Sequence, residues 1–133
     1  MTEKPQYPEA NYPFQEITDA IIAAGIAVHN ELGPGFVESI YENALVAELL
    51  SQGRKVGRQQ AFRVYYKGQE VGLHRLDLIV DNEVIMELKS VEAVGQVHEA
   101  QLRSTLKAAG KRVGLLINFN HPMLTKGIRR VIC

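Results

Sequence analysis

Apolar residues follow helical spacing along the first part of the chain. From Phe14 onward they recur on one face of a helix, at Ile17, Ala20, Ile21, Ala24 and Val28. Gly33-Pro34-Gly35 ends this helix, because Pro34 disfavours helical geometry in the residue before it and glycine adopts positive φ. A second helix is predicted over about Glu38 to Ser51, and Gly53 ends it.

The pattern changes to that of β-strands after Gly57. Three apolar runs separated by turns predict an antiparallel three-strand meander over residues 61–66, about 71–80 and 84–89. Helical spacing returns at about residues 97–109, residues 112–119 are typical of a buried strand, and residues 128–132 form a short last strand. We therefore expect an α/β fold in the order helix, helix, three strands, helix, strand.

Residues 1–13 contain three prolines and no apolar periodicity, so we interpret them as a flexible N-terminal arm. The remainder, 14–133, is expected to form a single domain, because 46% apolar and 23% charged residues are ordinary values for a soluble globular chain of this length. The lone cysteine, Cys133, excludes an internal disulfide, and the longest apolar stretch is far shorter than the ~20 residues that cross a bilayer. We expect a cytoplasmic location and no membrane contact.

Charge is distributed unevenly along a chain whose net charge is zero. Residues 1–50 hold eight acidic residues and one basic residue, whereas residues 51–133 hold 14 basic and seven acidic residues. One interpretation is that acidic helices pack against a basic remainder and leave solvated faces of both signs. The other is a basic surface that contacts a polyanion such as nucleic acid. Charge alone leaves both interpretations open.

Charged residues interrupt two of the predicted strands, at Asp77, Glu87 and Lys89. Side chains alternate between faces along a strand, so Glu87 and Lys89 share a face with Ile85. The residues between them, Val84, Met86 and Leu88, point to the other face. A carboxylate and an ammonium group on a partly buried face are costly unless they are paired or used.

The length of the turn between these strands decides whether Asp77 joins that face. A three-residue connection at Asp81-Asn82-Glu83 pairs Val80 with Val84, and the same register then pairs Asp77 with Glu87. A two-residue connection places the two carboxylates on opposite faces. We expect the three-residue connection.

Two carboxylates at the edge of a sheet suit a hard divalent cation such as Mg²⁺, which takes oxygen ligands and keeps water for substrate phosphate. A neighbouring lysine can orient water and neutralise charge that develops on phosphorus. The alternative is an ion pair of Lys89 with Glu87 or Asp77 that has no catalytic use. These three residues by themselves leave both interpretations open.

The spacing of Asp77 and Glu87-Leu88-Lys89, on two strands between a leading and a following helix, resembles the core of the PD-(D/E)XK phosphodiesterase superfamily. Gly35-Phe36-Val37-Glu38-Ser39-Ile40-Tyr41 is similar to the signature of the GxxExxY protein family, whose members are regarded as relatives of that superfamily. The similarity covers roughly residues 14–132. It implies a restriction-endonuclease-like fold, in which helices flank a mixed central sheet.

The resemblance also implies roles for individual residues. Asp77 and Glu87 become metal ligands together with the carbonyl oxygen of Leu88, and Lys89 becomes the catalytic lysine. Glu38 matches an acidic residue that holds metal or water in many relatives. Gln101 matches the glutamine of a Gln-x-x-x-Tyr helix motif that contacts substrate in some branches, although Thr105 stands at the tyrosine position.

The second predicted helix carries further candidates, because Glu38, Tyr41 and Glu42 share one of its faces. Tyr41 is a candidate substrate contact or a core residue, and Glu42 is expected at the surface. His29, His74 and His98 are expected to be structural.

Together these observations predict a nuclease that uses Mg²⁺ or Mn²⁺ to hydrolyse phosphodiester bonds of nucleic acid. The alternative is a non-catalytic module that keeps the nuclease fold and binds nucleic acid or protein through its basic half. A domain of this size leaves little surface for specificity, so a homodimer or a partner protein is also considered.

Overall fold

A mixed sheet in the strand order β1-β4-β5-β6-β7 forms the centre of the fold in the computed structural model, which describes residues 13–133. Its strands are β1 Val56–Arg58, β4 Leu78–Val80, β5 Val84–Lys89, β6 Val113–Asn118 and β7 Ile128–Ile132. β5 and β6 are parallel, and the other neighbouring pairs are antiparallel. This is the mixed sheet expected for a restriction-endonuclease-like α/β fold. Residues 1–12 of the expected arm lie outside the described residues.

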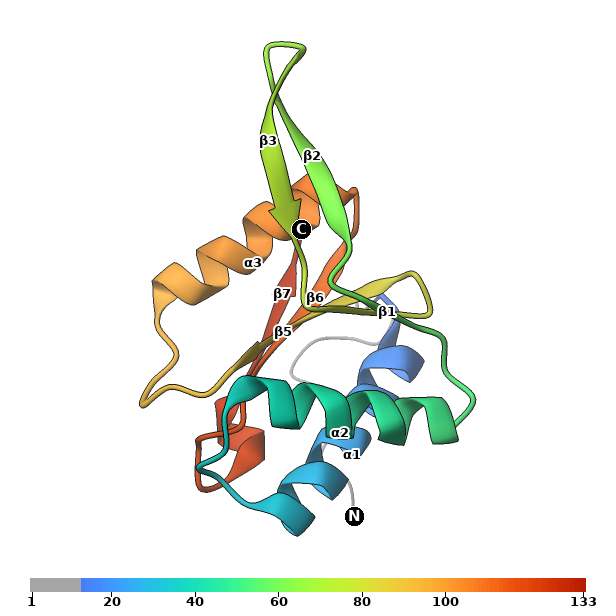
Figure 1. The fold of residues 1–133 in the computed structure, drawn as a ribbon, viewed down its shortest axis with the longest axis vertical. Coiled ribbons are helices and arrows are strands. Elements are labelled where there is room, and N and C mark those ends of the chain that lie inside the picture. Colours follow the sequence, from blue (N-terminus) through green and yellow to red (C-terminus); the bar gives the residue numbers. More distant parts are fainter. Residues whose placement is uncertain (1–12) are drawn as a thin grey trace.

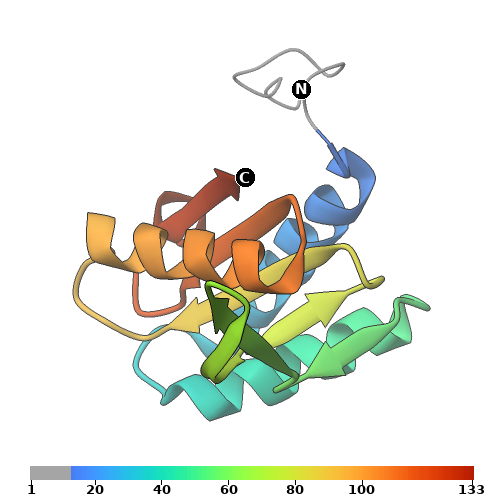
Figure 2. The ribbon, with the colours of Figure 1, turned by 90° about the horizontal axis from the view of Figure 1, so that it is seen from above.

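Helices cover both faces of this sheet. The helices α1 (Gln15–Leu32) and α2 (Glu38–Ser51) pack on one face, and α3 (Gln96–Ala109) packs on the other. Figure 2 shows the sheet between α3 on one side and α2 on the other. The larger apolar cluster lies between the sheet and α1 with α2, and a smaller one lies under α3. In the described part of the chain, none of the helices is long and apolar enough to cross a bilayer.

The helix predictions are confirmed with small changes at the ends. The first helix continues to Leu32 and stops at Gly33, whose φ of 70° lies in the left-handed region that glycine tolerates. The second helix has the predicted bounds, and the third begins one residue before the predicted start. A short 3₁₀ helix, η2 (Leu124–Gly127), precedes the last strand.

The expected meander differs in one respect, because the strand predicted over residues 71–80 is divided at Leu76 and Asp77. Its first part, β3 (Gln69–Arg75), pairs with β2 (Ala61–Tyr66) in a separate two-stranded sheet. Its second part is β4, which pairs with β1 and β5 in the central sheet. The division follows from packing: Leu76 joins the cluster under α3, whereas Leu78, two residues later, joins the cluster under α1 and α2.

The strand β1 was not among the predicted strands, since three residues that include Gly57 carry no alternation. Gly57 pairs with Ile79, and a Cβ atom at position 57 would lie 2.8 Å from the Ile79 side chain. A larger residue at position 57 would collide with this side chain, so the β1–β4 pairing requires glycine there.

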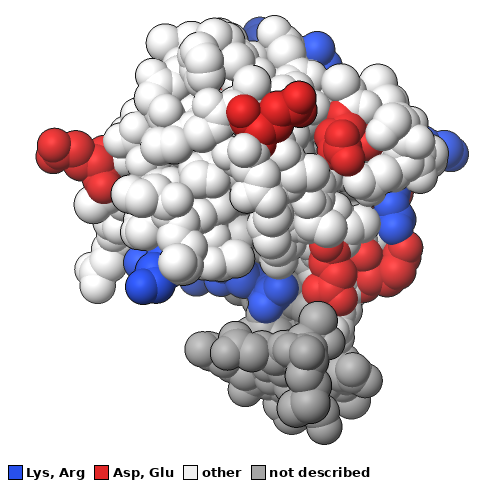
Figure 3. Space-filling view, turned by 90° about the horizontal axis from the view of Figure 1, so that it is seen from below, with Lys and Arg blue, Asp and Glu red and all other residues white. Residues whose placement is uncertain are grey.

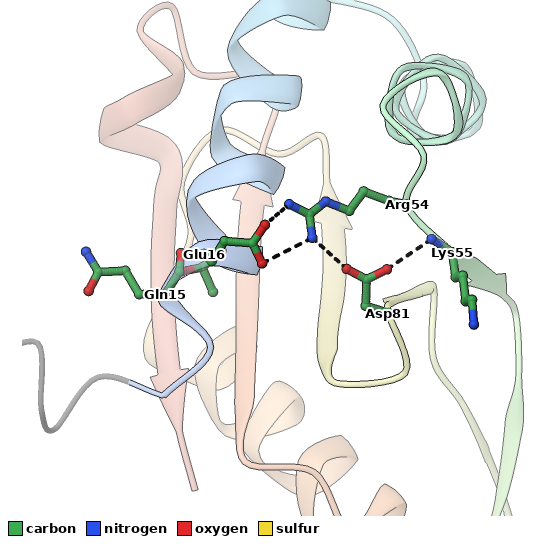
Figure 4. A network of polar contacts seen from close by, with 6 residues as sticks. Gln15, Glu16, Arg54, Lys55 and Asp81 are labelled. Atoms are coloured by element: carbon green, nitrogen blue, oxygen red, sulfur yellow. Dashed lines mark hydrogen bonds and ion pairs between the residues drawn. The ribbon is translucent and has the colours of Figure 1, made fainter.

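An ion-pair network ties α1 to the turn between β4 and β5 (Figure 4). The Arg54 guanidinium lies between the carboxylates of Glu16 and Asp81, and its Nη1 donates to Asp81 Oδ2 at 2.8 Å. The Lys55 amide donates to Asp81 Oδ1 at 3.0 Å. Burial raises the pKa of the Asp81 carboxyl, but the hydrogen bonds from Lys55 and Arg54 outweigh it and hold that pKa below its ordinary value. The network fixes the turn that sets the β4–β5 register.

Candidate functional site

The turn between β4 and β5 has the three-residue length that brings Asp77 and Glu87 together. Val80 pairs with Val84 across it, and Asp81 and Asn82 both adopt left-handed backbone conformations with φ of 51° and 57°. The same register extended by one pair beyond Leu78–Met86 places Asp77 opposite Glu87. The prediction about turn length is confirmed.

The two faces of β5 are divided as the alternation predicts. Ile85 belongs to the apolar cluster under α3, whereas Val84, Met86 and Leu88 belong to the cluster under α1 and α2. Alternation from Ile85 puts Glu87 and Lys89 on the α3 side of the sheet. Both side chains are half-buried.

Asp77 is the half-buried residue that directly precedes β4. Its Oδ2 accepts a hydrogen bond from the Leu88 amide at 2.9 Å, and its carboxylate also accepts one from the Gln59 side chain. Burial raises the pKa of the Asp77 carboxyl above its ordinary value, and the Leu88 hydrogen bond opposes this rise. The carboxylate is held in one orientation by backbone and is partly withdrawn from water.

Glu87 has the largest perturbation among the acidic residues of this site. Burial, reinforced by the neighbouring Asp77 carboxylate, raises the pKa of Glu87 to about 7, while Lys89 opposes the rise. Two half-buried carboxylates at one point of a sheet repel each other unless a proton or a cation lies between them. The Asp77–Glu87 pair therefore favours binding of a proton or a cation.

Glu38 is the first residue of α2 and reaches the same site from the other helical layer. Partial burial raises the pKa of its carboxyl, with the Lys89 ammonium opposing and the Asp77 carboxylate adding to the rise. The four residues proposed as catalytic from the sequence, Glu38, Asp77, Glu87 and Lys89, therefore lie within electrostatic range of one another.

Tyr41 lies in the core and has no exposed surface. Its ring stacks on Phe119, with 4.5 Å between ring centroids, and its hydroxyl donates to the Gly33 carbonyl and accepts from the Phe36 amide. The Ser90 hydroxyl, one residue after Lys89, donates to the Phe36 carbonyl at 2.9 Å. Of the two roles considered for Tyr41, the structure supports the core role: it fixes the loop that leads into Glu38 and is shielded from any substrate.

Gln101 and Thr105 lie on one face of α3, one turn apart. The Gln101 side chain is exposed, as a substrate contact requires. Thr105 is buried; its hydroxyl donates to the Gln101 carbonyl at 3.0 Å and lies 2.6 Å from Nε2 of His74. Thr105, which stands at the tyrosine position of the motif, therefore connects α3 to β3 through its contact with His74.

Sequence reasoning missed a polar bridge beside Asp77. Gln59 has a left-handed φ of 50°, and its side chain donates to Glu42 at 3.0 Å as well as to Asp77. Glu42, expected at the surface, is half-buried and pairs with Arg58 at 2.9 Å. Adjacent glutamines in a loop give no sequence signal for this role, because the partners are distant in the chain.

Asn118 is the other missed residue, and here a signal existed: it is a polar residue at the end of an otherwise apolar strand. It is buried, and its side-chain amide accepts from the Val91 N–H at 3.1 Å and donates to the Val91 carbonyl at 2.9 Å. These bonds hold the chain immediately after Lys89.

The donor set of the site suits a hard divalent cation. Asp77 and Glu87 supply oxygen ligands, and the Leu88 carbonyl faces the Asp77 edge because the N–H and C=O of one strand residue point to the same side. Over residues 13–133, no three His, Cys, Asp or Glu side chains are grouped closely enough to form a metal centre by themselves. Two carboxylates and a carbonyl leave the remaining ligand positions to water and substrate, as Mg²⁺ allows.

The fold and this site define an α/β domain with an acidic pair and a lysine on adjacent strands of a mixed sheet. The family model of the PD-(D/E)XK nuclease superfamily matches residues 15–131, and the chain belongs to that superfamily. The narrower GxxExxY assignment is not confirmed. No curated protein and no solved structure matches the chain.

Proposed function

We propose that this protein is a divalent-metal-dependent nuclease that hydrolyses phosphodiester bonds of nucleic acid. The observation that carries the proposal is the meeting of Asp77, Glu87 and Lys89 where the start of β4 lies beside the end of β5, in a chain of the PD-(D/E)XK nuclease superfamily. The raised pKa values of both carboxyls support it, since they indicate a site that favours an added positive charge.

In the proposed mechanism, Asp77, Glu87 and the Leu88 carbonyl would hold Mg²⁺ or Mn²⁺, and Glu38 would hold a water molecule beside the cation. The bound cation supplies a positive charge that polarises a phosphate oxygen and lowers the pKa of water. The Leu88 amide keeps the Asp77 carboxylate oriented through the hydrogen bond at 2.9 Å. Burial of the two carboxylates weakens their hydration and so strengthens their interaction with any cation that enters.

Lys89 is the proposed catalytic ammonium group. It shares the α3 side of the sheet with Glu87 and interacts with the carboxylates of Glu38, Asp77 and Glu87, which keep its charge close to the reacting phosphate. From there it orients the attacking water for in-line displacement and neutralises charge that develops on phosphorus. Gln101 is proposed to contact the substrate from α3.

The proposal is tested by incubating the protein with labelled single- and double-stranded DNA and RNA, in Mg²⁺, Mn²⁺ or EDTA. We expect cleavage that requires the metal. Glu87→Gln and Lys89→Met should each lower the rate by about 10²-fold or more. Matched controls are Glu31→Gln on α1 and Lys126→Met on η2, which change the same residue types at exposed positions. Cleavage by Lys89→Met at the wild-type rate would contradict the mechanism.

A non-catalytic binding module is the second candidate. Thr105 favours this candidate, because it replaces the tyrosine of the motif and its hydroxyl contacts His74 instead of a substrate. Titration calorimetry with Mn²⁺ separates the two candidates. A nuclease gives saturable heat that Glu87→Gln removes, whereas a binding module gives none. For either candidate we propose a cytoplasmic location.

A further inference from the structure

The hairpin of β2 and β3 stands apart from the central sheet. Its strands pair with each other and project beyond α3, as Figure 1 shows. At the base, Phe62 packs against the apolar cluster under α3, and His74 contacts Thr105. Towards the tip, four apolar or aromatic side chains are 59–66% exposed: Tyr65, Tyr66, Val71 and Leu73. A two-stranded ribbon with this much exposed surface is only marginally stable in water, which points to a contact that it makes.

The hairpin interleaves basic and aromatic residues. Residues 61–75 contain three basic residues, Arg63, Lys67 and Arg75, and one acidic residue, Glu70. Glu70 pairs with Arg63 at 3.2 Å, and the Lys67 ammonium lies 5.4 Å from the centre of the Tyr66 ring. Cations contact phosphates, and exposed aromatic or apolar side chains contact the thymine methyl groups in the major groove, so this combination suits nucleic acid. The face seen from below in Figure 3 has a broad area of uncharged side chains with acidic and basic groups around it.

The hairpin also leads directly into the candidate site. Arg75 at the end of β3 is two residues before Asp77, and its guanidinium donates at 3.0 Å to the carbonyl of Gln59, whose side chain binds Asp77. The hairpin base packs on α3, and Glu87 and Lys89 face the α3 side of the sheet. The base of the hairpin therefore lies close to the carboxylates.

The shape of the hairpin favours duplex DNA. From Arg75 to the turn at Lys67 the ribbon spans roughly 25 Å at ~3.3 Å per residue, which equals about seven base pairs at ~3.4 Å per pair. The major groove of B-DNA accommodates a two-stranded ribbon, whereas the deep, narrow major groove of duplex RNA does not. A polyanion is favoured over a protein partner because residues 61–75 carry three basic residues against one acidic residue.

We propose that the β2–β3 hairpin is an arm that binds duplex DNA in the major groove beside the cleavage position. This inference rests on the proposed nuclease function and adds its substrate class and the element that holds the substrate. Lys67 contacts phosphate, while Tyr66, whose ring lies beside the Lys67 ammonium, contacts the groove.

The test measures binding separately from cleavage. Fluorescence anisotropy in EDTA compares a labelled 20-base-pair DNA duplex, duplex RNA of the same sequence and single-stranded DNA, with the full chain. The variant Tyr66→Thr/Lys67→Asn removes the ring and the charge but keeps a strand former and a residue that tolerates the φ of 48° at the turn. The matched control is Met123→Thr/Lys126→Asn, which changes exposed residues on the η2 side.

We expect wild type to prefer duplex DNA. The hairpin variant should raise Kd about tenfold and lower the slope of log K against log salt by about one, while the control leaves both unchanged. Circular dichroism and urea denaturation verify that both variants are folded. The protein could bind duplex DNA through the hairpin and yet fail to cleave it. That result supports the hairpin as a DNA-binding arm and contradicts the nuclease proposal.

The opposite results overturn the inference and leave the nuclease proposal standing. These are metal-dependent cleavage with equal binding by wild type and hairpin variant, or a preference for duplex RNA or single strands. Loss of a dimer in the hairpin variant, detected by light scattering without a change in Kd for DNA, also overturns it, because the hairpin is then a protein interface.

Discussion

The Leu88 amide donates a hydrogen bond of 2.9 Å to the Asp77 carboxylate, so a proposed metal ligand also joins the start of β4 to the end of β5. The carboxylate that is proposed to bind the metal thus also has a structural role. Substitutions at position 77 can separate these roles, because asparagine keeps the acceptor and alanine does not.

Asp77→Asn should retain the fold and lose cleavage. Its side-chain carbonyl still accepts from the Leu88 amide, while the lost charge removes repulsion with Glu87. Asp77→Ala leaves that amide without its partner and should be less stable than Asp77→Asn by about 1–3 kcal/mol. Urea denaturation measures the difference. Equal stability of the two variants would mean that the hydrogen bond contributes nothing.

Glu87 should make the metal-free protein less stable as pH rises. Its pKa is about 7 in the folded state against an ordinary value of 4.5, so the folded protein binds more protons between these values and its unfolding free energy falls across that window. Glu87→Gln removes this fall and should be more stable than wild type by about 1–3 kcal/mol at pH 8.

The measurement is urea denaturation in EDTA from pH 4 to pH 8. Glu31→Gln on α1 is the control and should keep the wild-type profile, since Glu31 lies outside the site. A Glu87→Gln profile that still falls as steeply as wild type between pH 4.5 and 7 contradicts the prediction.

These two predictions rest on the part of the site that the sequence supplied. Alternation along residues 84–89 and the length of the Asp81–Glu83 connection depend on local geometry, so both could be predicted. The division of the second strand could not, because apolar spacing continues through residues 71–80 and the break depends on Leu76 and Leu78 packing under different helices. Gln59 was missed for the same reason: its partner Glu42 comes from another element.

Tyr41→Phe should weaken catalysis although Tyr41 is shielded from substrate. The Phe36 amide and the Gly33 carbonyl lose a shared partner, which lowers the unfolding free energy by about 1–2 kcal/mol and loosens the loop before Glu38. We expect kcat to fall with little change in KM.

Ser90→Ala is the companion of that variant, because it removes a different hydrogen bond from the same loop. It should change kcat in the same direction by a smaller factor. A Tyr41→Phe protein that loses stability at the wild-type kcat would show that the loop does not position Glu38.

Asp81→Asn should lower the unfolding free energy at neutral pH and make that free energy less dependent on pH in the acid range. The pKa of Asp81 lies below the ordinary value of 3.8, so its ion pair with Arg54 stabilises the fold above that pH and is lost as pH falls through the folded value. Asparagine tolerates the left-handed backbone and still accepts from the Lys55 amide.

For this variant we expect a loss of about 0.5–1 kcal/mol at pH 7 that disappears near pH 2. Thermal unfolding across pH measures it. A loss that persists unchanged at pH 2 would assign the effect to the backbone rather than to charge.

Asn118 offers Val91 a donor and an acceptor at once, in place of the neighbouring strand that has ended there. Aspartate is isosteric but cannot donate to the Val91 carbonyl, and leucine can do neither. The Asn118 carboxamide thus holds the segment after Lys89 to the sheet through two hydrogen bonds, and the Asn120 side chain adds one more, to the Val91 carbonyl at 3.3 Å. We expect position 118 to accept almost no replacement, even though it touches neither the reacting groups nor the solvent.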